Sequence, residues 1–275
     1  MARTNLNAVR VKPETSELIT LRVLRTERIS PHFARVTLGD GDIDRFSPMG
    51  FDQWFRLFIP VNGGTLSRVP RKLTTTSYLR YLTVSKTKRP LLRNYTVRAY
   101  RPDGMDGPEL DVDFVLHGSA DDQTAGPAAI WATTCTKGDI VGILDEGIGF
   151  NPAPSIDRVL LVADESGLPA VAGILSALPP GTKGRVLVEL PSEDDRQDLT
   201  TPDGVDVEWI VRENGVPGRT VLKAAESLDL PTEPFFAWTV GEQTLPTQLR
   251  RHWVKAGVPK NNIMFCGYWR NTHNH

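Results

Sequence analysis

The sequence predicts a two-domain β + α/β fold, in which an N-terminal antiparallel six-stranded barrel precedes an open, mostly parallel α/β sheet. Three observations carry this prediction. The 275 residues suffice for two domains of ordinary size. Short segments of alternating apolar and polar residues, separated by glycine- and proline-rich turns, fill the first half. Near residue 153 the pattern changes to continuous apolar runs that alternate with amphipathic segments. We therefore expect domains at residues 18–152 and 153–275.

The expected barrel strands are short and alternate apolar with polar side chains, as half-buried strands do. They cover residues 18–25, 33–38, 54–60, 94–101, 109–117 and 140–144. Residues 62–90 interrupt this series with glycine, a threonine run and many basic side chains. We expect them to form a long excursion from the barrel.

The second half reads as alternating strands and helices. Residues 158–163 form a continuous apolar run, which a buried parallel strand requires. Further strands are expected at 185–190, 205–211, 235–240 and 263–268, and helices at 168–178, 220–228 and 245–256. Open parallel sheets bind ligands beyond the carboxyl ends of their strands. Residues that directly follow a strand are therefore the candidates for a binding site.

Composition narrows the function classes. A formal net charge of −1 argues against a nucleic-acid partner. The two cysteines, Cys135 and Cys266, stand apart, so they predict neither a zinc site, nor an iron–sulfur cluster, nor a disulfide framework. No secretory signal or long apolar run is visible, so membrane insertion is not expected. These observations favour the reducing cytoplasm.

One stretch of the chain is strongly basic. Residues 56–102 contain eleven arginines and lysines and no acidic residue. Such a run is either a solvated loop or a surface that receives an anionic partner.

The first motif with chemical content is the strand segment Arg93-Asn94-Tyr95-Thr96-Val97-Arg98. A flavin needs a cation for its phosphates, an aromatic or apolar wall for its ring and a hydrogen-bonding partner at N5. Arginine, tyrosine and threonine supply these within a few residues. A basic edge strand with a packed tyrosine explains the same segment equally well.

The second motif is the strand with Asp113 and Val115, followed by His117 and then by Gly126-Pro127-Ala128-Ala129. Glycine before proline is typical of a helix start. Such a start presents free backbone N–H groups to an anion. The alternative is an ordinary strand, loop and short helix.

Two further motifs follow strands of the second half. Asp164, Glu165 and Ser166 come after the apolar run, without the GxGxxG pattern typical of dinucleotide sites. Read alone, they are as well explained by an N-capping turn. Gly241 and Glu242 follow another expected strand, and Tyr268 and Trp269 close the last one, where they either reach the crevice or anchor the C-terminus.

The order of these motifs resembles the siderophore-interacting protein family of ferredoxin-NADP reductase-like flavoproteins. The resemblance rests on RNYTVR, DFVLHG, GPAAIWA, VADESGLPA, TVGE, LRRHWVKAGVP and GYWR, and it runs from about Leu21 to Arg270. It implies a barrel that holds FAD non-covalently, a C-terminal NAD(P)-binding-like domain and reduction of ferric siderophores in the cytoplasm.

The resemblance also implies site residues. The expected FAD-binding residues are Arg93, Tyr95, Thr96, Asp113, Val115, His117, Gly126, Pro127, Ala128, Ala129, Asp164, Glu165, Ser166 and Trp269. Gly241 and Glu242 match the position that related reductases use near NAD(P)H. We add the hypothesis that Arg68, Arg71, Lys72, Lys86, Lys88 and Arg270 receive the ferric siderophore.

The predicted reaction is electron transfer by the flavin, which requires no acid–base residue and no resident metal. NADH, NADPH and a separate ferredoxin stay open as electron donors. Two other functions also stay open, a general NAD(P)H–flavin reductase that serves a partner protein and a non-catalytic siderophore-binding module. We expect the chain to act as a monomer.

Overall fold

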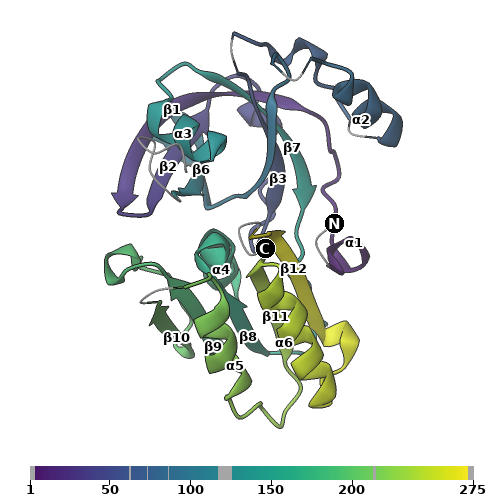
Figure 1. Ribbon diagram of the computed structural model, residues 1–275, viewed down its shortest axis with the longest axis vertical. Helices are drawn as coiled ribbons and strands as arrows, with labels where there is room; N and C mark the ends of the chain where they lie inside the picture. Colours follow the sequence, from purple (N-terminus) through teal and green to yellow (C-terminus); the bar gives the residue numbers. More distant parts are fainter. Residues whose placement is uncertain are drawn as a thin grey trace. The chain divides into compact units, whose positions relative to one another are not determined.

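The structure is a computed structural model, and it describes residues 4–61, 63–72, 74–85, 87–116, 126–212 and 215–271. Its contacts divide the chain into two compact units (Figure 1). The barrel unit comprises Lys12–Met49 and Gln53–Gly147, and the α/β unit comprises Met1–Val11, Gly50–Asp52 and Ile148–His275. The α/β unit therefore draws on segments on both sides of the expected boundary, whereas the barrel unit lies wholly before it.

The short segment Gly50–Asp52 belongs to the α/β unit, where the buried carboxylate of Asp52 holds it in place. Asp52 Oδ1 accepts hydrogen bonds from the backbone N–H groups of Gly149 (2.9 Å) and Phe150 (2.8 Å), and Oδ2 accepts from Trp238 Nε1 at 3.1 Å. Burial raises the pKa of Asp52. These partners lie far along the chain, which is why the sequence did not reveal that three residues leave the barrel.

The barrel unit contains one antiparallel sheet of seven strands in the order β4-β3-β7-β1-β2-β6-β5. Its strands are β1 (Ile19–Ser30), β2 (Phe33–Gly39), β3 (Trp54–Ile59), β4 (Leu91–Thr96), β5 (Ala99–Gly104), β6 (Gly107–Val115) and β7 (Ile140–Gly147). The predicted fold class is confirmed, but the sheet has seven strands where we expected six.

The extra strand arises because the expected strand at 94–101 is two strands. The backbone N–H of Val97 bonds to Gln53 O beside β3, whereas that of Arg98 bonds to Asp111 O on β6. The chain thus changes partner between β4 and β5, although its apolar–polar alternation continues through the break. Since β4 and β5 are the two sheet edges and only two residues join them, the sheet must curl until its edges meet, as in a barrel.

Alternation along the strands builds the barrel core. Val36, Leu38, Leu110, Val112 and Phe114 are fully or almost fully buried. The polar side chains that alternate with them on β6 form an acid row, Glu109, Asp111 and Asp113, which is also buried. Arginines of neighbouring strands cover this row, as described below.

Short helices surround the sheet. They are the 3₁₀ turns η1 (Ile43–Arg45) and η2 (Leu66–Arg68) and the helices α2 (Thr75–Leu82) and α3 (Pro127–Thr134). The turn η2 and the helix α2 belong to the expected excursion. Helix α3 contacts β1, β2, β4 and β6, and Thr26 Oγ1 on β1 donates to Ala132 O at 2.9 Å.

The α/β unit contains one five-stranded sheet in the order β10-β9-β8-β11-β12. Its strands are β8 (Arg158–Ala163), β9 (Lys183–Leu190), β10 (Gly204–Val211), β11 (Phe236–Glu242) and β12 (Ile263–Trp269). All four strand pairings are parallel. Every strand predicted for the second half is present.

The predicted helices are present as well. They are α4 (Leu168–Ala177), α5 (Arg219–Glu226) and α6 (Thr244–Lys255), and smaller elements are α1 (Leu6–Val9), η3 (Glu165–Gly167), η4 (Glu193–Asp195) and η5 (Lys260–Asn262). Helices α5 and α6 lie side by side (Figure 1). They share a core that includes Leu160, Val221, Leu249 and Trp253. No helix in the described part of the chain is long and apolar enough to cross a membrane.

Candidate functional site

The barrel unit contributes a cation and an aromatic ring on β4. Arg93 is exposed, and its Nη1 donates to the Leu92 carbonyl at 2.8 Å. The Tyr95 ring is half-buried, with its centroid 4.3 Å from that of Phe114. Burial raises the pKa of the Tyr95 hydroxyl, so this group stays neutral at physiological pH. Thr96 ends the strand and is buried.

Helix α3 contacts this strand. Its N-cap is Gly126, which has no side chain to cap the first N–H groups, and Pro127 follows in the first turn. Ala128 is buried against the barrel core, and Ala129 packs partly against it. Because α3 contacts β4, this unit brings together a guanidinium, a neutral phenol ring and a helix N-terminus. This set of groups fits a flavin that carries phosphates.

The three remaining FAD-binding candidates of the barrel unit are Asp113, Val115 and His117. The Asp113 carboxylate is held by Arg35 at 2.7 and 2.9 Å and lies 3.5 Å from Arg98. Two arginines therefore contact the Asp113 carboxylate within the barrel unit. Val115 is half-buried at the end of β6. His117 lies outside the described residues.

Asp164 occupies the switch point of the α/β sheet, between the carboxyl ends of β8 and β11. Its carboxylate is fully buried. Oδ1 accepts from Ser166 N (2.9 Å) and Ser166 Oγ (2.5 Å), and Oδ2 accepts from Glu242 N (2.6 Å) and Trp269 Nε1 (3.2 Å). Burial, aided by the nearby charge of Glu165, raises the Asp164 pKa to about 7.

Gly241 makes this arrangement sterically feasible. It has a φ of +138°, and a Cβ at this position would lie 2.6 Å from Asp164 Cγ. The adjacent Glu242 is buried, and its carboxylate accepts from Thr244 N at 2.8 Å. The residues that we assigned separately to FAD and to NAD(P)H, Asp164 and Gly241-Glu242, therefore form one hydrogen-bonded cluster.

Glu165 faces a different partner from its neighbour Asp164. Arg212 donates to its two carboxylate oxygens at 2.6 and 2.7 Å. Arg212 also contacts Glu189 at 3.2 Å, and Glu189 accepts from the first N–H groups of α5, Gly218, Thr220 and Val221. The sequence analysis missed Arg212 and Glu189, although a lone glutamate within the apolar segment 186–190 was an available signal.

Comparison with known proteins agrees with this geometry. Residues 22–148 match the model of the siderophore-interacting FAD-binding domain, and residues 156–272 match that of the siderophore-interacting protein domain. The chain belongs to the siderophore-interacting protein family. An uncharacterised relative from Mycobacterium tuberculosis is 37% identical over 196 residues, which cover 71% of this chain and 65% of that protein.

The relatives of this siderophore-interacting protein include proteins whose names state a function, and two of them match nearly the whole chain. A ferric vibriobactin reductase of Vibrio cholerae is 26% identical over 92% of this chain and 90% of its own length. An NADPH-dependent ferric-chelate reductase of Escherichia coli is 28% identical over 90% of this chain and 91% of its own length.

Solved structures confirm the fold. A siderophore utilization protein from T. fusca superimposes with a TM-score of 0.77 and 26% identity over 96% of this chain and 97% of that one. A ferredoxin reductase of carbazole 1,9a-dioxygenase, at 14% identity and a TM-score of 0.64, covers 94% of this chain and 71% of its own. This second likeness shows the shared reductase fold alone.

The basic residues expected to receive the siderophore divide between the two units. Arg68, Arg71, Lys72 and Lys88 are exposed on the barrel unit, and Arg270 is exposed on the α/β unit. Lys86 lies outside the described residues. Glu17 pairs with Arg71 and Lys72, both at 3.3 Å, which lowers the Glu17 pKa, chiefly through Lys72.

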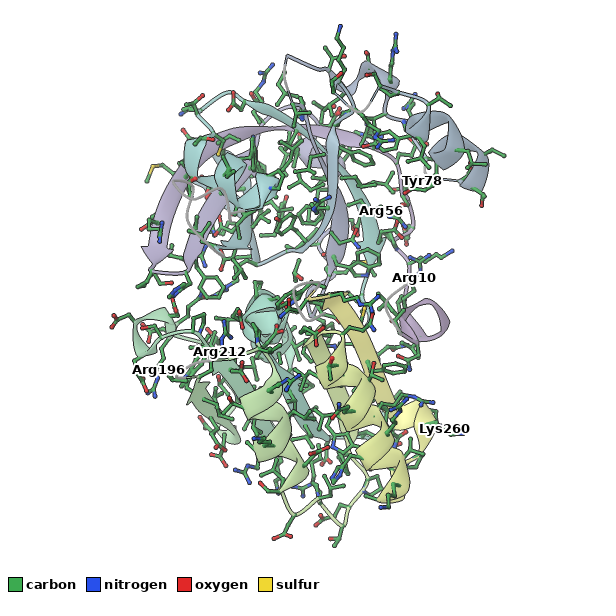
Figure 2. All side chains as sticks on the ribbon, in the orientation of Figure 1. Arg10, Arg56, Tyr78, Arg196, Arg212 and Lys260 are labelled. Carbon is green, nitrogen blue, oxygen red and sulfur yellow. The ribbon has the colours of Figure 1, made fainter. Side chains whose placement is uncertain are left out.

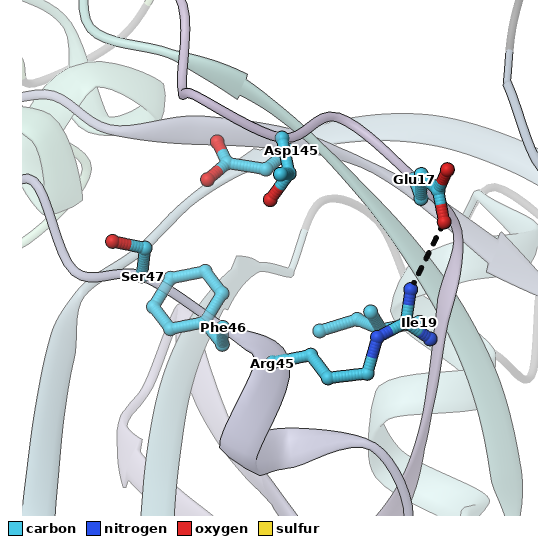
Figure 3. A pocket seen from close by; sticks show the side chains of 7 residues that line it. Glu17, Ile19, Arg45, Phe46, Ser47 and Asp145 are labelled. Atoms are coloured by element: carbon cyan, nitrogen blue, oxygen red, sulfur yellow. Dashed lines mark hydrogen bonds and ion pairs between the residues drawn. The ribbon is translucent and has the colours of Figure 1, made fainter.

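A pocket of about 390 Å³ opens in the barrel unit of the siderophore-interacting protein (Figure 3). It lies between Arg45, Phe46 and Ser47 on one side and Glu17, Ile19 and Asp145 on the other. Arg45 donates to Glu17 at 3.2 Å across its mouth. Burial raises the Asp145 pKa, while bonds from Gly147 N and the Gln53 side chain oppose the shift. The sequence analysis did not anticipate this pocket.

Proposed function

We propose that this chain is an FAD-dependent reductase that converts a ferric siderophore to its ferrous form and so releases iron. The observation that carries the proposal is that β4, which bears Arg93 and Tyr95, contacts helix α3 in the barrel unit. The names of the vibriobactin and ferric-chelate reductases support the same reaction. Our expected FAD residues stay a proposal, residue by residue.

The chain's own groups would hold the cofactor in distinct ways. The Arg93 guanidinium and the N–H groups at the start of α3 would bind phosphate oxygens. The neutral Tyr95 ring would form an apolar wall beside the flavin. The Asp164 cluster would position Ser166, Trp269 and the Gly241-Glu242 backbone on the nucleotide side. Bound FAD would supply the capacity to accept two electrons and pass them singly.

The substrate chemistry explains why no acid–base residue is needed. Siderophores hold Fe(III) through hard, anionic oxygen ligands, which bind Fe(II) less tightly. One electron therefore loosens the iron without any bond to the protein. The exposed Arg68, Arg71, Lys72 and Lys88, together with Arg270, would attract the negatively charged complex.

The electron donor and the setting belong to the same proposal. NADPH is favoured by the name of the Escherichia coli relative, and NADH or a ferredoxin would replace it if NADPH fails to reduce the flavin. The two cysteines are buried and free, which supports a reducing cytoplasm as the compartment. We propose that a monomer suffices, because every group invoked comes from one chain.

The test is FAD binding by the purified chain and its Arg93→Ala variant. The chain is expected to show the visible spectrum of bound flavin. Loss of a charge-assisted hydrogen bond should weaken FAD binding by roughly ten- to a hundred-fold. Arg22→Ala is the control, since Arg22 on the same sheet is exposed and its contacts, an ion pair with Asp40 at 3.4 Å and a hydrogen bond to the Gly138 carbonyl at 3.2 Å, do not involve β4 or α3. A chain that takes up no FAD would refute the reductase and favour a siderophore-binding module.

Steady-state turnover then separates the acceptors. Ferric siderophore is expected to be reduced faster than cytochrome or free FMN, with the released Fe(II) trapped by a ferrous chelator. The opposite ranking would identify a general flavin reductase that serves a partner protein.

A further inference from the structure

Helix α2 of the barrel unit carries an apolar face that it does not bury. Tyr78, Leu79 and Leu82 are 38%, 59% and 41% exposed, whereas Tyr81 is only 3% exposed. At about 100° per residue, these four side chains occupy one continuous stripe of the helix. Exposure rises from the Tyr81 edge, which faces the barrel, to the Leu79 edge.

The barrel holds α2 along this single edge. The Tyr81 ring packs edge-on against Phe58 with centroids 5.7 Å apart, and its hydroxyl donates to the Pro90 carbonyl. A pocket of about 570 Å³ separates the helix from the segment Ser67–Pro70. The Tyr78 ring stacks on the Tyr81 ring with centroids 6.3 Å apart, and its helix lies at the periphery of the barrel unit (Figure 2). No residue in the described ranges covers Leu79 or Leu82 enough to bury either one.

The chain segment that contains this stripe carries charged residues of one sign. Residues 61–90 contain seven arginines and lysines and no acidic residue. Arg68 lines the pocket beside α2, the Lys72 carbonyl accepts from Ser77 Oγ at 2.7 Å, and the Arg89 guanidinium lies 5.7 Å from the centre of the Tyr81 ring. Glu17 offsets part of this charge through its pairs with Arg71 and Lys72.

We propose that α2 and its basic surroundings form an interfacial surface that binds anionic phospholipid bilayers. An amphipathic helix with tyrosine and leucine on one face and cations around it is suited to the headgroup boundary, where apolar side chains enter and cations pair with lipid phosphates. The charge complementarity is direct, because the segment has no carboxylate of its own to repel an anionic headgroup.

The size of the surface favours a bilayer over a protein partner. An eight-residue helix is about 12 Å long. A stable protein interface needs about 800 Å² from each partner with matching shape. A fluid bilayer requires no shape match and accepts three side chains individually. This surface is additional to the proposed reductase activity and does not depend on it.

Co-sedimentation of the full chain with vesicles tests the proposal. The chain should pellet with phosphatidylcholine vesicles that contain phosphatidylglycerol, less so with phosphatidylcholine alone, and less at high salt. The double variant Leu79→Glu, Leu82→Glu should lower the partition coefficient at least about tenfold, because it removes two apolar anchors and adds repulsion. Met105→Glu is the matched control, since Met105 is 90% exposed in the same unit and lies outside the stripe.

The outcomes are distinct. Salt-sensitive binding to anionic vesicles that the double variant loses and Met105→Glu keeps would support the surface. Equal pelleting of all three proteins would overturn it, and so would absence of binding to anionic vesicles. Circular dichroism of the double variant must match that of the parent chain, and Leu79→Ser, Leu82→Ser provides a milder pair that must show a smaller loss in the same direction.

Discussion

The acid row of the barrel unit and Asp164 of the α/β unit are buried in opposite surroundings. In the barrel unit, the acid row Glu109, Asp111 and Asp113 faces arginines. In the α/β unit, Asp164 faces N–H groups and a hydroxyl. The consequence is visible in acidity, because hydrogen bonds from Arg25 and Arg101 lower the Glu109 pKa to about 2, whereas burial raises the Asp164 pKa to about 7. Burial alone therefore does not decide the charge of an acidic group.

Sheet geometry explains the difference. In the antiparallel barrel, Arg35 lies directly opposite Asp113, and Arg101 directly opposite Glu109, so cross-strand pairing delivers a cation to each carboxylate. Arg101 also reaches Asp111 at 2.6 Å. At the end of a parallel sheet, the neighbours of a side chain are loops and helix starts, which offer backbone N–H groups instead. Ion pairs thus hold the strands of the barrel together at the acid row, whereas hydrogen bonds to Asp164 position the loops at the switch point.

The largest expected effect on stability comes from removing the arginine that pairs with a buried carboxylate of the barrel unit. Arg35→Met leaves the buried Asp113 with only the longer contact to Arg98 at 3.5 Å. We expect a loss of about 3 kcal/mol in the free energy of unfolding, measured by urea denaturation, since an uncompensated charge stays buried. Arg185→Met is the control, because its pair with Glu208 at 3.0 Å is half-exposed and should contribute well under about 1 kcal/mol. Equal losses in the two variants would contradict the contrast.

The same contrast marks what the sequence could predict. Local periodicity placed the five strands and the helices α4, α5 and α6 of the α/β unit, because a continuous apolar run or a helical spacing is contained within one segment. Short motifs, rather than periodicity, gave Arg93, Tyr95 and the segment that begins α3 as FAD-binding candidates, and these stay a prediction. Periodicity missed the break after Thr96, since the new hydrogen-bond partners, Gln53 and Asp111, are distant in sequence.

Pairings between distant residues account for the other gaps. Asp113 stays a predicted cofactor contact, but nothing near it in sequence reveals that Arg35 donates to its carboxylate. Helix α2 was expected only as part of an excursion, although the spacing of Tyr78, Leu79 and Leu82 was a helical signal. Asp164 and Glu165 are adjacent and chemically alike, yet the fold gives N–H donors to one and Arg212 to the other.

The raised pKa of Asp164 in the α/β unit should make the free energy of unfolding depend on pH. Between about pH 4 and pH 7 the folded chain keeps a proton that the unfolded chain has released, because the folded pKa of about 7 exceeds the ordinary value of 3.8. The free energy of unfolding should therefore fall as pH rises through this window. Asp164→Asn removes the titrating group, and the fall should shrink by about 2 kcal/mol.

Site-resolved amide hydrogen exchange of β8 and β11, corrected for intrinsic rates, provides the measurement. The difference in slope between the two proteins is the readout, since asparagine also changes the hydrogen bonds to Ser166 and Trp269 at every pH. Parallel slopes would show that Asp164 stays ionised throughout, and the contrast with the barrel would then vanish.

Titration of Glu109 should give a smaller effect of opposite sign. Its folded pKa, about 2, lies below the ordinary 4.5, so its contribution is complete above about pH 4.5 and is lost as pH falls toward 2. Arg25 and Arg101 are about two-fifths exposed, and solvent screens their charges. We therefore expect the parent chain to lose only about 1 kcal/mol more than Glu109→Gln between these pH values, by urea denaturation. Glu208→Gln, which alters an exposed pair, should titrate like the parent. If Glu109→Gln also kept the parent's acid dependence, the arginines would cover the acid row without stabilising its charge.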